Sequence, residues 1–336
     1  MKKSTYSVAV VGATGLVGRE IVTALEQREF PVGDLQLYAS ARSAGDEIAC
    51  GRIAARVELL ERARFEGTDV VFLTAGEQVS AEWIGRVTDA GAVAIDASQL
   101  FAGDADVPLI VPEVNAASIA GYTERGVVAC PDSPAVALAV VLNPLHAAAA
   151  LRRVVVSTYE PLSGAGDAGI EELQRQTIEL MSGRSVESEL FAHRVAFNVV
   201  PQIGEMLAGA VTRDERLTAA ALRRLLDAPE LTVSVTRVHV PLFYGAALSV
   251  NIETAEKLTA AQARDILRPS PGVLLQDDAP YSTPIDAVGQ DATAVGRIRE
   301  DEATNVLDLW LTIDNIRKGA AVNAVQIAEL LLRDYL

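Results

Sequence analysis

Two side chains that could act as nucleophiles, Cys130 and Ser133, lie three residues apart in the segment V-V-A-C-P-D-S-P-A at positions 127–135. A thiol at a helix N-terminus can ionise near neutral pH, whereas a serine hydroxyl needs a well-placed general base. Three residues of extended chain span about 10 Å, so the two groups cannot share one attacking position unless the loop refolds. The segment therefore contains two alternative candidate nucleophiles. One is a serine that needs a base, and the other is a cysteine about 10 Å along the chain from it.

Both side chains also have a structural interpretation. Ser133 precedes Pro134 and the apolar run 135–142, the order typical of a helix N-cap followed by proline in the first turn. We therefore expect Ser133 to cap a helix. Cys130 follows an apolar stretch, and we expect it to be a buried, unreactive thiol.

Further polar residues could support a reaction near Ser133. Arg237 and His239 alternate along an expected strand and so share one face, where Arg237 could bind an anion. His239 could serve as a base, although we expect it to pack. Glu160 could assist hydrolysis by Ser133, but no Ser-His-Asp order or oxyanion signature accompanies it. Three scattered histidines and two cysteines predict neither a metal site nor a disulfide.

The clearest motif is the glycine-rich stretch G-A-T-G-L-V-G, which follows a β-branched run and opens an amphipathic stretch. Glycines in such a turn let the backbone approach a pyrophosphate, whose charge the helix N-terminal amides then bind. The alternative is a tight strand-to-helix turn without a ligand. The candidate cofactor residues of this motif are Gly12, Ala13, Thr14, Gly15, Leu16, Val17 and Gly18.

The end of the next strand indicates which dinucleotide is bound. The stretch Y-A-S-A-R-S-A-G lacks the acidic residue that binds the ribose hydroxyls in an NAD site. Arg42, flanked by Ser40 and Ser43, could instead bind a 2'-phosphate. The sequence therefore favours NADP over an ordinary polar surface loop.

The elements around these residues change character along the chain. In the first half, short β-branched runs (8–11, 35–39, 69–73, 92–95 and 127–129) alternate with helical stretches (15–27 and 77–90), the pattern of a parallel sheet. Longer strands with period-two alternation follow at 232–240, 247–253 and 306–314, and the spacing at 318–332 predicts a helix. We predict an α/β Rossmann-like domain and an α+β domain with a mixed sheet, and we expect 268–289 to be irregular.

Composition limits the classes of function. A chain of 336 residues exceeds what one core usually organises, so two domains are expected. Its formal charge of −16 argues against nucleic acids and anionic membranes as partners. No apolar stretch has the length of a signal peptide or of a membrane span, so we expect a cytoplasmic protein.

Seven segments in the same order resemble the aspartate-semialdehyde dehydrogenase family. They are G-A-T-G-L-V-G, S-A-R-S-A-G, V-P-L-I-V-P-E-V-N, S-T-Y-E-P-L-S-G-A-G, A-F-N-V-V-P-Q-I, V-G-R-I-R and D-N-I-R-K-G-A-A-V-N-A-V-Q-I-A-E. The resemblance implies an NADP-binding domain at 1–130 and 318–336, a catalytic and dimerisation domain at 131–317, and a homodimer. It also implies cofactor contacts from Ser163, Gly164 and Asn323, and reductive dephosphorylation of aspartyl phosphate through a cysteine thioester.

The chain departs from the family pattern at functional positions. Ser133 replaces the nucleophilic cysteine, and Ala246 replaces the basic histidine. His239 replaces the arginine that holds the substrate carboxylate, and Glu160 replaces a glutamine. The arginine of the phosphate site is also missing, because the corresponding segment ends Phe101-Ala102.

Three hypotheses follow from these departures. The first is a catalytically impaired paralogue that retains the dimer and the NADP site and acts on an unknown ligand or in association with an active relative. The second is an active NADP-dependent oxidoreductase for an aldehyde or acyl phosphate of aspartate-pathway biosynthesis, which uses Cys130 or a remodelled site. The third is a cofactor-independent hydrolase that uses Ser133.

Overall fold

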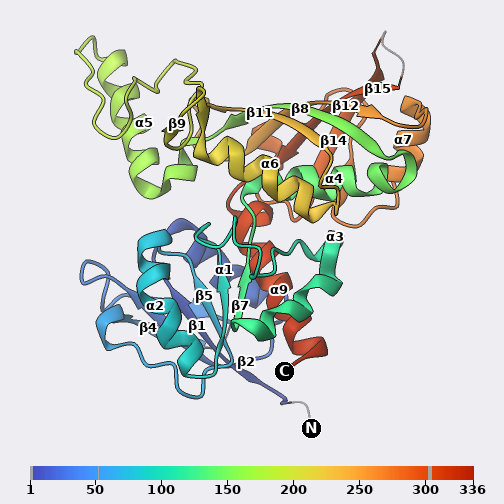
Figure 1. Cartoon of the computed structure of the whole chain (residues 1–336). Helices are drawn as coiled ribbons and strands as arrows, with labels where there is room; N and C mark the ends of the chain where they lie inside the picture. The colour runs from blue at the N-terminus through green and yellow to red at the C-terminus, as the bar shows by residue number, and fades with distance from the viewer. Residues whose placement is uncertain (1–2, 52, 302–304) are drawn as a thin grey trace. The chain divides into compact units, whose positions relative to one another are not determined.

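The computed structural model describes residues 3–51, 53–301 and 305–336, which belong to two compact units (Figure 1). Unit 1 comprises Met1–Asp132 and Ala320–Leu336, and unit 2 comprises Ser133–Gly319. Within the described ranges, none of the helices combines the length and apolarity that a membrane span requires.

In the described part of unit 1, a seven-stranded sheet has the order β3-β4-β2-β1-β5-β6-β7. Strand β3 is antiparallel to β4, and the other strands run parallel. The predicted Rossmann-like sheet is thereby confirmed, and its central strands are buried apolar runs, as a parallel sheet requires. The strands are β1 (Tyr6–Val11), β2 (Val32–Ala39), β3 (Glu47–Cys50), β4 (Ile53–Leu59), β5 (Val70–Leu73), β6 (Val93–Asp96) and β7 (Val127–Ala129).

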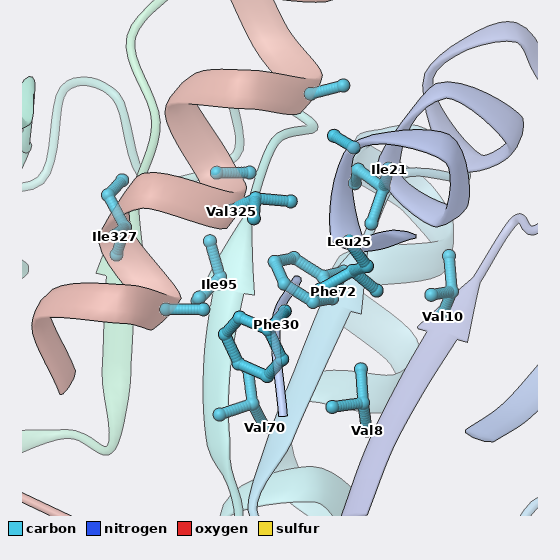
Figure 2. Close-up of a cluster of buried hydrophobic side chains, with 14 of the residues drawn as sticks. Val8, Val10, Ile21, Leu25, Phe30, Val70, Phe72, Ile95, Val325 and Ile327 are labelled. Carbon is cyan, nitrogen blue, oxygen red and sulfur yellow. The ribbon is translucent and has the colours of Figure 1, made fainter. Parts of the chain in front are cut away.

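Helices from both ends of the sequence build the core of unit 1. Figure 2 shows Ile21 and Leu25 of α1 and Val325 of α9 around Phe72 of the sheet, and all four side chains are buried. Each such burial stabilises the fold by about 1.5–3 kcal/mol. The helices of this unit are α1 (Leu16–Gln27), η1 (Leu60–Arg62), α2 (Glu77–Asp89), α3 (Pro112–Asn115), η2 (Ala116–Glu124) and α9 (Asn323–Asp334).

Two features of the chain differ from the sequence-based expectation. The β3–β4 hairpin was not expected, and the predicted helix at 318–332 begins with a π-helical turn, η4 (Arg317–Val322), before α9. The π spacing is visible in the bond from the Gly319 amide to the Asp314 carbonyl, five residues earlier (2.9 Å).

The described residues of unit 2 contain a six-stranded mixed sheet with the order β11-β8-β12-β15-β14-β13. The pairs β11–β8 and β13–β14 are parallel and the others antiparallel, which confirms the predicted mixed sheet. A short hairpin, β9 (Met206–Leu207) and β10 (Val211–Thr212), lies outside it. The strands of the large sheet are β8 (Leu151–Glu160), β11 (Thr232–His239), β12 (Ala246–Thr254), β13 (Val273–Leu275), β14 (Thr293–Glu300) and β15 (Val306–Ile313).

One face of this sheet is covered by helices. The apolar helix α4 contacts β8, β12, β14 and β15, as well as α6 and α7. On the opposite face, which we call the open sheet face, Tyr159, Ser249 and Trp310 are half-buried or exposed, and the rings of Tyr159 and Trp310 lie 5.8 Å apart. The helices of unit 2 are α4 (Ser133–Ala149), η3 (Leu162–Ala165), α5 (Gly166–Met181), α6 (Arg213–Leu225), α7 (Ala260–Leu267) and α8 (Pro284–Ala287). The segment expected to be irregular thus holds the short elements β13 and α8.

Candidate functional site

The glycine-rich turn of unit 1 has the geometry of a phosphate-binding loop. Gly12 has φ +89°, and a Cβ on Gly18 would lie 2.2 Å from the Gly12 carbonyl oxygen, so both positions require glycine. The amides of Gly12 and Ala13 donate to the Tyr38 carbonyl (2.8 and 3.1 Å), which fixes the turn above β2. Among the described residues no side chain caps α1 after Gly15, so its first-turn amides, including those of Leu16, Val17 and Gly18, can bind an anion. This loop fits a dinucleotide pyrophosphate.

The turn after β2 carries the residues expected to select the nucleotide. The amides of Ser43 and Ala44 donate to the Ser40 carbonyl (3.0 and 3.2 Å), which forms a compact turn. Ser40 and Arg42 are exposed. Within the part of the chain that the structure describes, no acidic side chain pairs with Arg42, so its guanidinium is available for an external anion.

Ser133 is the first residue of α4, and the prediction that its side chain caps the helix is wrong. Its Oγ is buried and has no hydrogen-bond partner among the described residues. The side chain packs on Gly319 instead: a Cβ built on that glycine would lie 2.4 Å from Ser133 Oγ. A serine already in helical conformation cannot act as the extended N-cap residue. No described hydrogen bond joins its hydroxyl to Glu160 or His239.

Glu160 and Arg237 form a buried bidentate ion pair in unit 2. Arg237 Nε donates to Glu160 Oε1 (2.7 Å) and Arg237 Nη2 donates to Glu160 Oε2 (2.6 Å). Thr158 Oγ1 also donates to Glu160 Oε1 (2.6 Å), and Arg237 Nη1 donates to Thr218 Oγ1 (3.2 Å). The sequence indicated Arg237 as a group that could bind an anion. In the structure its guanidinium binds a carboxylate of the same chain instead.

His239 is packed in the interior of unit 2. Its backbone amide and carbonyl bond to Val200 (2.9 and 3.0 Å), and its ring meets the edge of Phe191 with centroids 5.2 Å apart. Nδ1 has no partner within the described residues. Burial lowers the pKa of the imidazole, against the opposing effect of the Glu160 charge. A neutral ring held in this way has the properties of a packing residue.

The remaining site residues of unit 2 lie where β12 begins. Ala246 is buried and pairs with Ile313 in the sheet. Its side chain is a methyl group, which can neither donate nor accept a proton. Ser163 is also buried, and its Oγ accepts a hydrogen bond from Asn315 Nδ2 (3.0 Å), while Asn315 Oδ1 accepts from the Gly245 amide (3.0 Å). Gly164, by contrast, is exposed, with open space where a Cβ would be.

Cys130 and Asn323 lie in the core of unit 1. Asn323 is fully buried and its Nδ2 donates to the Ile110 carbonyl (3.1 Å). Burial, reinforced by the charge of Asp96, raises the pKa of the Cys130 thiol far above its ordinary value. A buried thiol that resists ionisation is a poor nucleophile, as the structural interpretation of Cys130 expects.

Two residues of the ion-pair network escaped the sequence analysis. Glu215 Oε1 accepts a bond from the Arg237 amide (3.1 Å), and Thr218 binds the guanidinium. The spacing T-R-D-E at 212–215 is a readable capping box, and Thr212 and Glu215 form it. The contacts of Glu215 and Thr218 with Arg237 depend on how α6 lies on β11, for which the sequence gives no signal.

Comparisons with known proteins agree with this architecture. Residues 7–122 match the family model of the semialdehyde dehydrogenase NAD binding domain, and residues 142–318 match that of the semialdehyde dehydrogenase dimerisation domain.

Full-length relatives and solved structures extend the match. The chain is 40% identical over 332 residues to aspartate-semialdehyde dehydrogenase 2 of Vibrio cholerae, with 98% of each chain covered. A crystal structure of aspartate semialdehyde dehydrogenase II from Vibrio cholerae, complexed with ASA, matches with a TM-score of 0.97 and 39% identity over 99% of this chain and all of that one. A probable aspartate-semialdehyde dehydrogenase from Pseudomonas aeruginosa matches with a TM-score of 0.94 and 35% identity, again over 99% of this chain and 100% of that one.

Proposed function

This chain belongs to the aspartate-semialdehyde dehydrogenase family, and on that basis we propose that it binds NADP as a homodimer but catalyses the family's reaction at a severely reduced rate. The observation that carries this proposal is the environment of Ser133: its hydroxyl has no base among the described residues to activate it. The family's histidine position holds buried Ala246, and His239 stands where a substrate-binding arginine is expected. Each of these replacements removes a group that would stabilise the same transition state, so together they lower the rate of the family reaction.

The decisive experiment measures reduction of NADP with aspartate semialdehyde and phosphate. The purified protein is compared with its Ser133→Cys variant and with an authentic family dehydrogenase. We expect no turnover by the natural protein above background and at most a small gain in the variant, because the other replacements remain. Turnover within about tenfold of the authentic enzyme would overturn the proposal.

Cofactor binding is tested separately, by calorimetric titration with NADP and NAD. We expect saturable binding that favours NADP, since Ser40 and Arg42 are exposed and Ser43 is half-buried in the turn that follows β2. The Arg42→Ala variant should lose this preference while it retains NAD affinity.

One observation favours a second candidate function. The 40% identity to a named dehydrogenase along the whole chain is compatible with an active oxidoreductase for a related aldehyde or acyl phosphate. In that case either Cys130, whose burial opposes formation of a thiolate, or a remodelled site would supply the nucleophile. Unchanged turnover by a Cys130→Ala variant would remove this thiol from the mechanism.

A further inference from the structure

The Glu160–Arg237 pair of unit 2 has the geometry with which an arginine binds a carboxylate ligand. Two parallel donors, Nε and Nη2, meet the two carboxylate oxygens at 2.7 and 2.6 Å. This side-on, bidentate arrangement is among the strongest and most directional contacts that a guanidinium makes with a carboxylate. Here the carboxylate is supplied by a neighbouring strand rather than by a small molecule.

Other residues anchor the backbone and the guanidinium of Arg237 independently of Glu160. The backbone amide of Arg237 donates to Glu215 Oε1 (3.1 Å), and its Nη1 donates to Thr218 Oγ1 (3.2 Å). Strand β11 also fixes the residue in register with Thr158. The site that receives the carboxylate is therefore built by residues other than Glu160.

The two side chains of the ion pair differ in their exposure to solvent. The side chain of Arg237 is 7% exposed and that of Glu160 is 12% exposed, so Glu160 is the more accessible member of the pair. Removal of the glutamate beyond Cβ would leave a space that matches acetate in its carboxylate and in its one additional carbon.

We propose that Glu160 is an internal ligand that fills a carboxylate-binding site on Arg237 and so closes unit 2 to external acidic ligands. The inference deepens the proposed function and rests on it in one respect. The family resemblance is what places residue 160 beside the acidic substrate. On this proposal a protein of this fold retains an arginine in that region, yet the guanidinium is not available to a substrate carboxylate.

Chemical rescue tests this proposal. The Glu160→Ala variant should melt several degrees below the natural protein, because the buried guanidinium loses its carboxylate partner. Sodium acetate should then raise the Tm of the variant by a few degrees in a saturable manner, whereas sodium chloride at equal ionic strength should not. The natural protein should show no such acetate response.

A matched variant identifies the binding group. Glu160→Ala combined with Arg237→Met keeps the cavity but removes the guanidinium, and its Tm should not respond to acetate. Equal acetate effects on the single and double variants, or no effect on folded Glu160→Ala, would overturn the proposal. If Glu160→Ala does not fold alone, its refolding yield is compared in acetate and in chloride; equal yields also count against the internal-ligand role.

The same preparations separate this inference from the proposed function. NADP titration reports on the glycine loop of unit 1, which contains none of the substituted residues. Acetate rescue with no NADP binding would support the internal ligand and refute the cofactor proposal, and the opposite result would do the reverse.

Discussion

The imidazole of His239 meets the ring of Phe191 and is influenced by the charges of Glu160, Arg237 and Asp214. Burial lowers its pKa in the folded protein, whereas the unfolded chain has the ordinary value of about 6.5. As the pH falls below that ordinary value, the unfolded state binds a proton that the folded state refuses. The stability associated with neutral His239 is therefore fully present above the unfolded pKa and is lost as the pH decreases toward the folded pKa.

The His239→Phe variant should remove this pH dependence. Phenylalanine preserves the edge contact with Phe191, and Nδ1 has no described partner to lose. Urea unfolding at pH 7.5 and at pH 5.5 should show a smaller decrease in free energy for the variant than for the natural protein. His193→Gln, at an exposed position, is the control and should behave like the natural protein. Equal decreases in all three proteins would mean that His239 does not titrate in this way.

The cysteines make a second prediction for single residues. Cys50 and Cys130 are both buried, and burial is the first cause of the raised pKa of each thiol. A disulfide reagent should therefore label neither thiol in the folded protein at pH 8 on the timescale in which it labels both after denaturation in guanidinium chloride. Fast labelling of native Cys130, located by peptide mass spectrometry, would instead support its role as a nucleophile.

The glycine loop is the element on which the cofactor proposal depends. A Cβ at position 18 would lie 2.2 Å from the Gly12 carbonyl oxygen and 2.8 Å from Ala13 Cα, so the backbone must move. Gly18→Ala should lower the free energy of unfolding by about 1–3 kcal/mol and weaken NADP binding at least tenfold, since the loop amides shift with the backbone.

Gly85→Ala is the matched control for that variant. Gly85 lies within α2 with nothing near the position of its missing Cβ, so alanine should stabilise the protein by about 0.5–1 kcal/mol and leave NADP affinity unchanged. Urea denaturation and calorimetric titration measure both effects. Unchanged NADP affinity in Gly18→Ala would show that this turn does not hold the pyrophosphate.

The elements differ in how far the sequence predicts them. Strand β5 is a four-residue apolar run and α1 follows a glycine motif, so local signals are strong and both were predicted. The β3–β4 hairpin was not predicted, although residues 55–59 of β4 alternate apolar and charged side chains. Strand β3 is short and, among the described residues, pairs only with β4, which in turn pairs with β2, and these pairings are not visible in a local stretch of sequence. The same limit applies to the site: the alternation of Arg237 and His239 on a strand was predictable, but the register that joins Arg237 to Glu160 was not.

For the whole molecule, the mixed sheet of unit 2 presents one face on which several side chains, such as those of Ser157, Ser249 and Asn251, are half-buried or exposed. The rings of Tyr159 and Trp310 contact each other at a tilted angle on this open sheet face, and Ser249 of the central strand β12 is exposed there. A broad face with aromatic side chains is typical of an interface, and residues 142–318 match a dimerisation domain. We therefore expect two copies of the chain to associate through this face.

Ser249→Arg tests that expectation, because it adds a charge at the centre of the face without changing the buried core. A two-fold interface brings the same residue from both copies into one region, so the two arginines would repel each other and remain poorly hydrated. Sedimentation equilibrium should show a dimer for the natural protein and a dimer dissociation constant at least 100-fold higher for the variant. Ala220→Arg, at an exposed position of α6 on the helix-covered side, should remain a dimer. A dimer of undiminished affinity in Ser249→Arg would place the interface elsewhere on the molecule.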